Sequence, residues 1–150
     1  MTKSFEAFDL TGKTALITGA AGLLGVEHAG ALLESGATVL LTDVDEAGLD
    51  VAQTVVSKEG DPSRIRTRVM DVAQGAIVRA VSAELSDSGQ RIDILINNAS
   101  IDPKVTDPEG ALEASRLEHF SLEQWNVPVS YTHLRAHETE ADLVCRLLLE

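Results

Sequence analysis

Thr18-Gly-Ala-Ala-Gly-Leu-Leu-Gly25 is the stretch of sequence that decides the fold. It follows an apolar run, 14–18, and precedes a segment of helical period from about Leu23 to Ser35. Between a strand and a helix, one glycine permits a tight turn, another lets the backbone approach a pyrophosphate, and a third lets helix and strand pack closely. The stretch therefore predicts a dinucleotide-binding turn, with a close-packed turn that binds nothing as the alternative.

Short apolar runs alternate with helical segments on both sides of this loop. We expect strands at 14–18, 39–42, 64–70 and 92–96, and helices at 23–35, 46–58 and about 77–85. Such alternation is typical of βα units that build a parallel sheet. The third run is the most polar and is therefore expected near an edge. The sequence predicts an α/β fold, a Rossmann-like doubly wound parallel sheet of order 3-2-1-4, truncated after about four strands. A loop at 99–120 and a helix that opens at Ser121 would follow.

Asp43 ends the second predicted strand, close to the spacing of about 20 residues at which dinucleotide-binding folds carry a ribose-binding acid. A carboxylate there accepts hydrogen bonds from both hydroxyls of an adenosine ribose and repels a 2′-phosphate, which favours NAD over NADP. The alternative is a solvated Asp43 in an ordinary turn, with Asp45 as the N-cap of the next helix.

Three motifs in this order resemble the short-chain dehydrogenase/reductase (SDR) family in its Tyr-dependent branch. They are the glycine loop from Thr18, the pair Asp71-Val72, and the run Asn97-Asn98-Ala99-Ser100. The resemblance covers roughly residues 10–127. It implies that Asp71 and Val72 hold the adenine, and that Asn97 lies at the nicotinamide side and ties neighbouring strands together. The implied cofactor-binding residues are Gly19, Gly22, Leu24, Gly25, Asp43, Asp71, Val72 and Asn97.

Two positions depart from that branch. Its middle glycine usually comes one position later, where this chain has Leu23, so the glycine spacing is that of the extended, sugar-nucleotide-modifying branch. Ser100 also replaces the glycine that commonly closes the Asn-Asn-Ala-Gly motif. The Asn-Asn-Ala motif still favours the shorter branch, and a fragment of an epimerase-type member stays as an alternative.

The resemblance implies a catalytic Ser and a Tyr-x-x-x-Lys pair beyond the fourth strand, where the Tyr is the acid/base for a carbonyl or hydroxyl group. The last lysine of this sequence is Lys104, and its only tyrosine, Tyr131, has Arg135 four positions later. We therefore assign no catalytic residue and expect the chain to be inactive as written. The intact enzyme would transfer hydride between NAD(H) and a carbonyl/alcohol substrate, whereas the rival reading is a stand-alone dinucleotide-binding module.

Residues 128–150 resemble no protein family. The blocks from Val129 to Thr139 and from Asp142 to Glu150 are similar to an in-frame translation of DNA sequencing-library adapter. We therefore expect residues 1–127 to be the N-terminal, dinucleotide-binding part of a single SDR domain and residues 128–150 to be a non-native tail. The genomic sequence beyond Val127 tests this expectation.

The amino-acid composition limits the classes of binding partner that we expect. Twelve Lys and Arg against 24 Asp and Glu give a net charge of −12, the wrong sign for nucleic acid or an anionic membrane surface. No apolar run approaches the roughly 20 residues of a membrane span, and the first residues carry no secretory signal, so we expect a cytoplasmic protein. Neither His28 nor His119 has metal-ligand spacing, and we predict no metal site. The expected partners are a dinucleotide and a small-molecule substrate, with homo-oligomers implied by the family resemblance.

Overall fold

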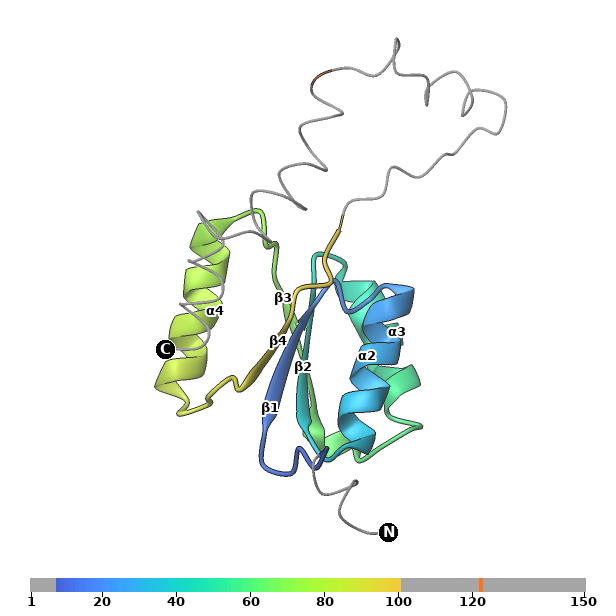
Figure 1. Ribbon diagram of the computed structural model, residues 1–150. Coiled ribbons are helices and arrows are strands. Elements are labelled where there is room, and N and C mark those ends of the chain that lie inside the picture. The colour runs from blue at the N-terminus through green and yellow to red at the C-terminus, as the bar shows by residue number, and fades with distance from the viewer. Residues whose placement is uncertain (1–7, 101–121, 123–150) are drawn as a thin grey trace, which may run out of the picture. The chain divides into compact units, whose positions relative to one another are not determined.

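The structure is a computed structural model that describes residues 8–100 and residue 122. The chain divides into two compact units, and residues 8–99 belong to the first. Four parallel strands form its sheet in the order β3-β2-β1-β4 (Figure 1). The strands are β1 (Thr14–Thr18), β2 (Thr38–Asp43), β3 (Ile65–Val69) and β4 (Ile94–Ile96). This confirms the predicted order and the place of the polar third strand at an edge.

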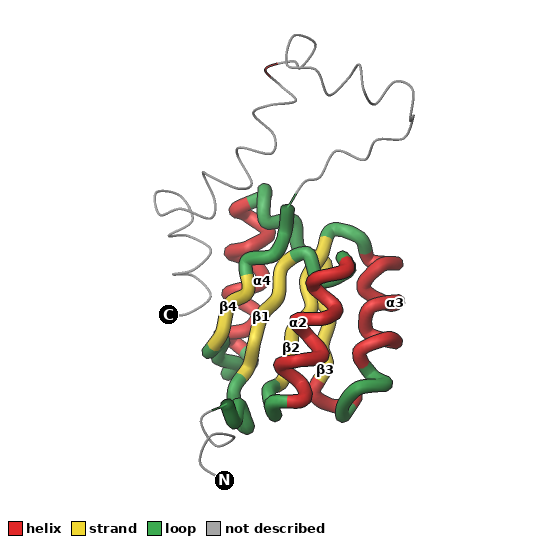
Figure 2. Tube along the Cα trace, turned by 45° about the vertical axis from the view of Figure 1, so that its right-hand side comes forward, coloured by secondary structure: helices red, strands yellow, loops and turns green. Residues whose placement is uncertain are grey.

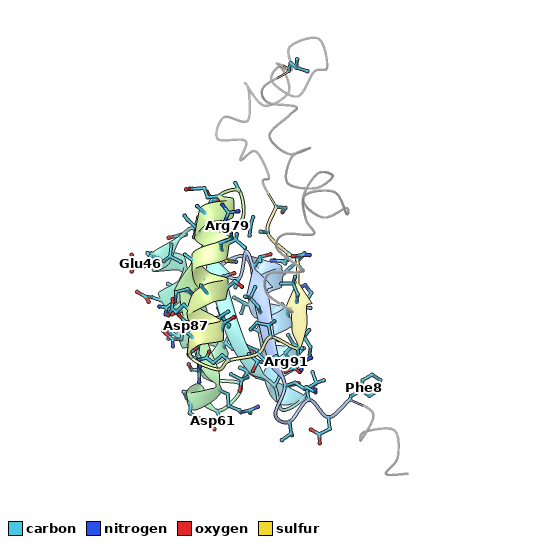
Figure 3. The ribbon with its side chains drawn as sticks, turned by 90° about the vertical axis from the view of Figure 1, so that its left-hand side faces the viewer. Phe8, Glu46, Asp61, Arg79, Asp87 and Arg91 are labelled. Carbon is cyan, nitrogen blue, oxygen red and sulfur yellow. The ribbon has the colours of Figure 1, made fainter. Side chains whose placement is uncertain are left out.

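The helices cover the two faces of the sheet unequally. They are α2 (Leu23–Glu34), α3 (Glu46–Val56) and α4 (Gly75–Asp87), with a short 3-10 turn, η1 (Pro62–Arg64), before β3. In Figure 2, α2 and α3 lie together on one face, and Figure 3 looks onto the other face, where Arg79 and Asp87 label α4. Right-handed crossovers explain this division, because the chain moves one way across the sheet from β1 to β3 and back the other way to β4.

Both faces of the sheet are buried at the central strands β1 and β2, which is why these two strand sequences are apolar without alternation. Ala15 and Ile17 pack into the core shared with α2 and α3, whereas Leu16 packs into the core shared with α4. The same division recurs on β2, where Leu41 faces the first core and Leu40 the second. The sheet therefore separates two apolar cores.

The ends of the elements differ from the predictions by one to two residues. Arg64, predicted as the start of the third strand, instead ends η1, and its guanidinium donates to the carbonyl oxygens of Leu33 and Ala37 at 3.1 and 3.0 Å. The predicted fourth strand starts too early: the Thr14 amide of β1 donates to the Asp93 carboxylate at 3.1 Å, and the ladder of β4 begins only at Ile94. Local apolar pattern cannot show either contact.

Several predictions fall outside the described residues: the loop 101–120, the adapter-like tail 128–150, His119 and Tyr131. Leu122 is helical, but the predicted start of that helix at Ser121 lies outside the described residues. None of the helices in the part of the chain that is described is long and apolar enough to cross a membrane.

Candidate functional site

The two outer glycines of the loop occupy positions that a side chain could not share. Gly19 has φ +64°, in the left-handed region, and a methyl group on it would lie 2.7 Å from Cα of Ala99. At Gly25 a methyl group would lie 2.6 Å from Cα of Ala20 and from the carbonyl oxygen of Gly19. Gly22 is exposed and less crowded. Among the described residues, a methyl group at Gly22 would approach only the carbonyl oxygen of Gly19, at 3.3 Å. The outer glycines therefore shape the turn, and the middle one leaves its outer side open.

The loop leads into α2 without a side-chain cap. Gly22 is the N-cap residue, and no described side chain accepts a hydrogen bond from the first turn of α2. In α3, by contrast, the Asp45 carboxylate accepts from the Gly48 amide at 3.0 Å. The first amide groups of a helix have no partner within the helix and carry a partial positive charge. The start of α2 is thus suited to an anionic ligand in a way that the start of α3 is not.

Asn98 ties the end of β4 to the glycine loop. Its side-chain amide donates to the carbonyl oxygens of Thr18 and Gly19 at 3.1 and 3.0 Å. The Thr18 hydroxyl accepts in turn from the backbone amides of Asn98 and Ala99, each at 3.0 Å. The family resemblance implied a strand-joining role for Asn97 and did not point to Asn98, although both belong to the same motif. Asn97 is exposed at the same strand end, and its strand-joining and nicotinamide-side roles both stay predictions.

Asp43 lies half-buried at the carboxyl end of β2. Its Oδ2 accepts from the amide of Ala21 in the glycine loop at 3.0 Å, and its Oδ1 accepts from the amide of Asp45 at 3.1 Å. Asp45 is the N-cap of α3, as the alternative interpretation expected, but Asp43 is not simply a solvated turn residue. It links the turn after β1 to the turn after β2.

Asp71 and Val72 follow β3 at the same edge of the sheet. The Asp71 carboxylate accepts from the Ala73 amide at 2.8 Å and from the Gln74 side-chain amide at 2.9 Å, which folds the turn that precedes α4. Val72 is half-buried against the core shared with α4. The backbone amide of Met70 donates to the carbonyl oxygen of Asp43 at 2.9 Å, so this turn starts beside the end of β2.

All eight predicted cofactor-binding residues lie at the carboxyl ends of the strands or in the first turn of α2. Leu24 is 62% exposed there, so its side chain is accessible. β1 and β4 are neighbours in the sheet, yet the helices α2 and α4 next to them in the chain cover opposite faces (Figure 1). Open α/β sheets bind ligands at this kind of switch point. Among the described residues, no group of three His, Cys, Asp or Glu could hold a metal ion.

Known proteins share this sequence pattern. The family model described as short chain dehydrogenase matches residues 13–129, well over half of the chain. Gluconate 5-dehydrogenase of Gluconobacter oxydans is 37% identical over 122 residues, which are 81% of this chain and 43% of that protein. The chain spans about half the length of such curated relatives, or less.

Solved structures share the fold. A gluconate 5-dehydrogenase from Burkholderia cenocepacia J2315, in complex with NADP and tartrate, has a TM-score of 0.71 and 27% identity, over 97% of this chain and 50% of that one. A 3-ketoacyl-(acyl-carrier-protein) reductase from Brucella melitensis, complexed with NADH, has a TM-score of 0.66 and 30% identity, over 91% and 48% of the two chains. Relatives of this fold thus include both an NADP complex and an NADH complex.

Proposed function

The chain belongs to the short chain dehydrogenase family, and from this premise we propose that it is the N-terminal, dinucleotide-binding part of an oxidoreductase. Members of this family bind NAD(P) and a small-molecule substrate. The cofactor supplies the hydride chemistry, and the reaction that we propose for the intact enzyme interconverts a carbonyl compound and an alcohol. What this chain's own residues contribute is binding and orientation of the dinucleotide.

The observation that carries the proposal is the geometry of the glycine loop and of the start of α2. Methyl groups at Gly19 and Gly25 would collide with backbone atoms, while the outer side of Gly22 is open. The amides of the first turn of α2 follow directly, without a capping side chain from the described residues. A tight turn, a close backbone approach and a helix N-terminus are the three parts that a pyrophosphate site needs.

The choice of NAD over NADP is supported by the charge beside this loop. The carboxylate of Asp43 lies at the end of β2, and the next acids along the chain are Asp45 and Glu46, both exposed (Figure 3 labels Glu46). A ribose hydroxyl can donate to such a carboxylate, whereas a 2′-phosphate would meet negative charge. We propose that Asp43 is the residue that discriminates between the two cofactors.

Calorimetric titration of the 150-residue chain with NAD, NADP and ADP tests the proposal. We expect NAD and ADP to bind with dissociation constants within a few-fold of each other, because the residues described hold mainly the adenosine half. NADP is expected to bind at least about tenfold more weakly, a difference of about 1.4 kcal/mol. An NADP affinity equal to or above that of NAD would refute the cofactor preference, and no binding of any of the three would refute the proposed site.

The same titration separates this proposal from a stand-alone module. A complete module would hold both halves of the cofactor, so NAD would bind far more tightly than ADP. The sequence contains no Tyr-x-x-x-Lys pair, and we expect the chain to oxidise no alcohol in the presence of NAD. Alcohol oxidation by the purified chain would show that catalysis needs none of the residues that the family resemblance implies.

We do not propose the epimerase alternative, because the matching family model is that of the short chain dehydrogenases, and relatives such as gluconate 5-dehydrogenase are also dehydrogenases. We do propose that residues 128–150 are a non-native tail. The family match ends at residue 129, next to the boundary expected after Val127. Amplification and sequencing of the locus tests this: a natural gene that reads from Val127 into Val129-Ser-Tyr-Thr-His133 contradicts it.

A further inference from the structure

The Asp43 carboxylate holds two separate backbone segments at once. Its Oδ2 accepts from the Ala21 amide of the glycine loop at 3.0 Å, and its Oδ1 accepts from the Asp45 amide at the start of α3 at 3.1 Å. The preceding loop amide, that of Ala20, donates to the carbonyl oxygen of Thr42 at 3.0 Å. Two consecutive amides of the loop are therefore anchored to two consecutive residues of β2, one through the backbone and one through a side chain.

The first turn of α3 closes against the same point of the loop. A methyl group at Gly48 would lie 2.9 Å from Cβ of Ala21 and 2.8 Å from Oδ2 of Asp45. Because Gly48 has no side chain, α3 can approach Ala21 this closely. The position of Ala21 is thus set by packing on one side and by the Asp43 carboxylate on the other.

An ionised carboxylate offers about four acceptor positions, of which the two backbone amides use two. Two positions remain for the hydroxyls of a ribose, so one side chain can hold the loop and a ligand at the same time. An asparagine has a single acceptor oxygen, and its NH₂ group would face a second amide donor. The isosteric change to Asn therefore removes loop support as well as negative charge.

We propose that Asp43 is a positioning residue for the glycine loop: its carboxylate fixes the Ala21 amide in the ligand-free protein and so preorganises the pyrophosphate-binding turn. This role rests on the proposed function for its consequence in binding. This role differs from ribose recognition in two ways. The carboxylate orders the loop in the absence of ligand, and the resulting gain in affinity concerns the pyrophosphate, which the carboxylate does not contact.

Nuclear magnetic resonance of the ligand-free 150-residue chain tests the first part. We expect a scalar coupling across the hydrogen bond between the Ala21 amide nitrogen and the Asp43 carboxyl carbon. In Asp43→Asn we expect hydrogen exchange at Ala21 to accelerate about three- to tenfold, the size of one lost hydrogen bond. Exchange at Ala20 is the internal control. A missing coupling together with unprotected exchange at Ala21 in the unaltered chain overturns the inference, whether or not the variant folds.

Ligand binding tests the consequence with ADP and with 2′,3′-dideoxy-ADP, which keeps the pyrophosphate and lacks both ribose hydroxyls. We expect Asp43→Asn to weaken both ligands, with about a three- to tenfold loss persisting for the dideoxy compound. The matched control is Asp45→Ser, which removes the same charge and keeps an N-cap for α3. It should weaken neither ligand, because less negative charge near the phosphates favours binding.

The outcomes separate this inference from the proposed function. A penalty of Asp43→Asn that disappears for dideoxy-ADP means that Asp43 acts through the ribose alone, which overturns the inference and leaves the proposed function intact. If the unaltered chain binds neither ADP nor NAD, the proposed function fails, and the coupling and exchange at Ala21 still decide whether Asp43 positions the loop.

Discussion

Gly25→Ala should destabilise the chain although it places a better helix former in the first turn of α2. The added methyl group would lie 2.6 Å from Cα of Ala20 and from the carbonyl oxygen of Gly19, and 2.9 Å from the carbonyl carbon of Ala20. These are backbone atoms of the turn after β1, so they cannot rotate away. Overpacking of this kind costs up to about 3 kcal/mol, against a gain of about 1 kcal/mol in helix propensity. We expect a net loss of about 2 kcal/mol.

Gly30→Ala is the matched control, because it makes the same change in the same helix at another buried glycine. Its methyl group would meet only the carboxylate of Glu59, the far end of an exposed and flexible side chain. Glu59 can adopt another rotamer, so the gain in helix propensity, about 1 kcal/mol, should survive. The two variants should therefore shift the free energy of unfolding in opposite directions.

Urea unfolding of the 150-residue chain, followed by circular dichroism, measures both variants against the unaltered chain. A difference of about 3 kcal/mol between them corresponds to more than 10 °C in thermal midpoint, at about 4–8 °C per kcal/mol for a unit of this size. Equal stability of Gly25→Ala and Gly30→Ala would refute the predicted clash, because the loop would then have room that the structure does not give it.

Three further predictions concern stability and use the same unfolding assay. The pKa of Asp93 is lowered from 3.8 by hydrogen bonds from the Thr14 amide and the Lys13 side chain. The stability that the ionised Asp93 side chain contributes is therefore present above pH 3.8 and is lost as the pH falls through the lower pKa of the folded state. Asp93→Asn should thus be less stable at pH 7 and equal to the unaltered chain once both are acidified; an unchanged difference would contradict this. Arg64→Met removes both bonds to the carbonyl oxygens of Leu33 and Ala37 and should cost about 1–3 kcal/mol, whereas no loss would mean that those carbonyl groups are satisfied by water. Gly36→Ala places a methyl group at φ +99° and 2.7 Å from the Thr11 hydroxyl, and should cost about 1 kcal/mol or more, with a neutral result excluding the strain.

The sequence predicted the strands, the helices and their order because these depend on local period and on turn residues. Each of three features can be recognised from the local sequence without knowing what it contacts: the strand run 14–18, the glycine cluster and the acid at position 43. The parallel order then follows from chirality rules that hold for most crossovers. Even the edge position of β3 could be inferred, since a run such as Ile65–Val69 with two arginines cannot be buried on both sides.

What could not be predicted are contacts between residues far apart in the chain. Asn98 reaches carbonyl groups of Thr18 and Gly19 that lie about 80 positions earlier, and Arg64 reaches the end of α2. Nothing in the local sequence shows that Asn98 is the residue whose side chain reaches these two carbonyl groups. Likewise, the acid at position 43 indicates a ribose acceptor, but only the folded chain shows that Asp43 already accepts from Ala21.

The structure also explains why the unusual glycine spacing leaves the fold unchanged. The position that usually carries the middle glycine of this branch is Leu23, and its side chain is 82% exposed at the start of α2. A side chain at this position therefore points to solvent and collides with nothing in the turn. The close contacts belong to Gly19 and Gly25, which keep their places. Spacing of the middle glycine is thus a weak guide to the branch, because the steric demand of the turn lies at its two ends.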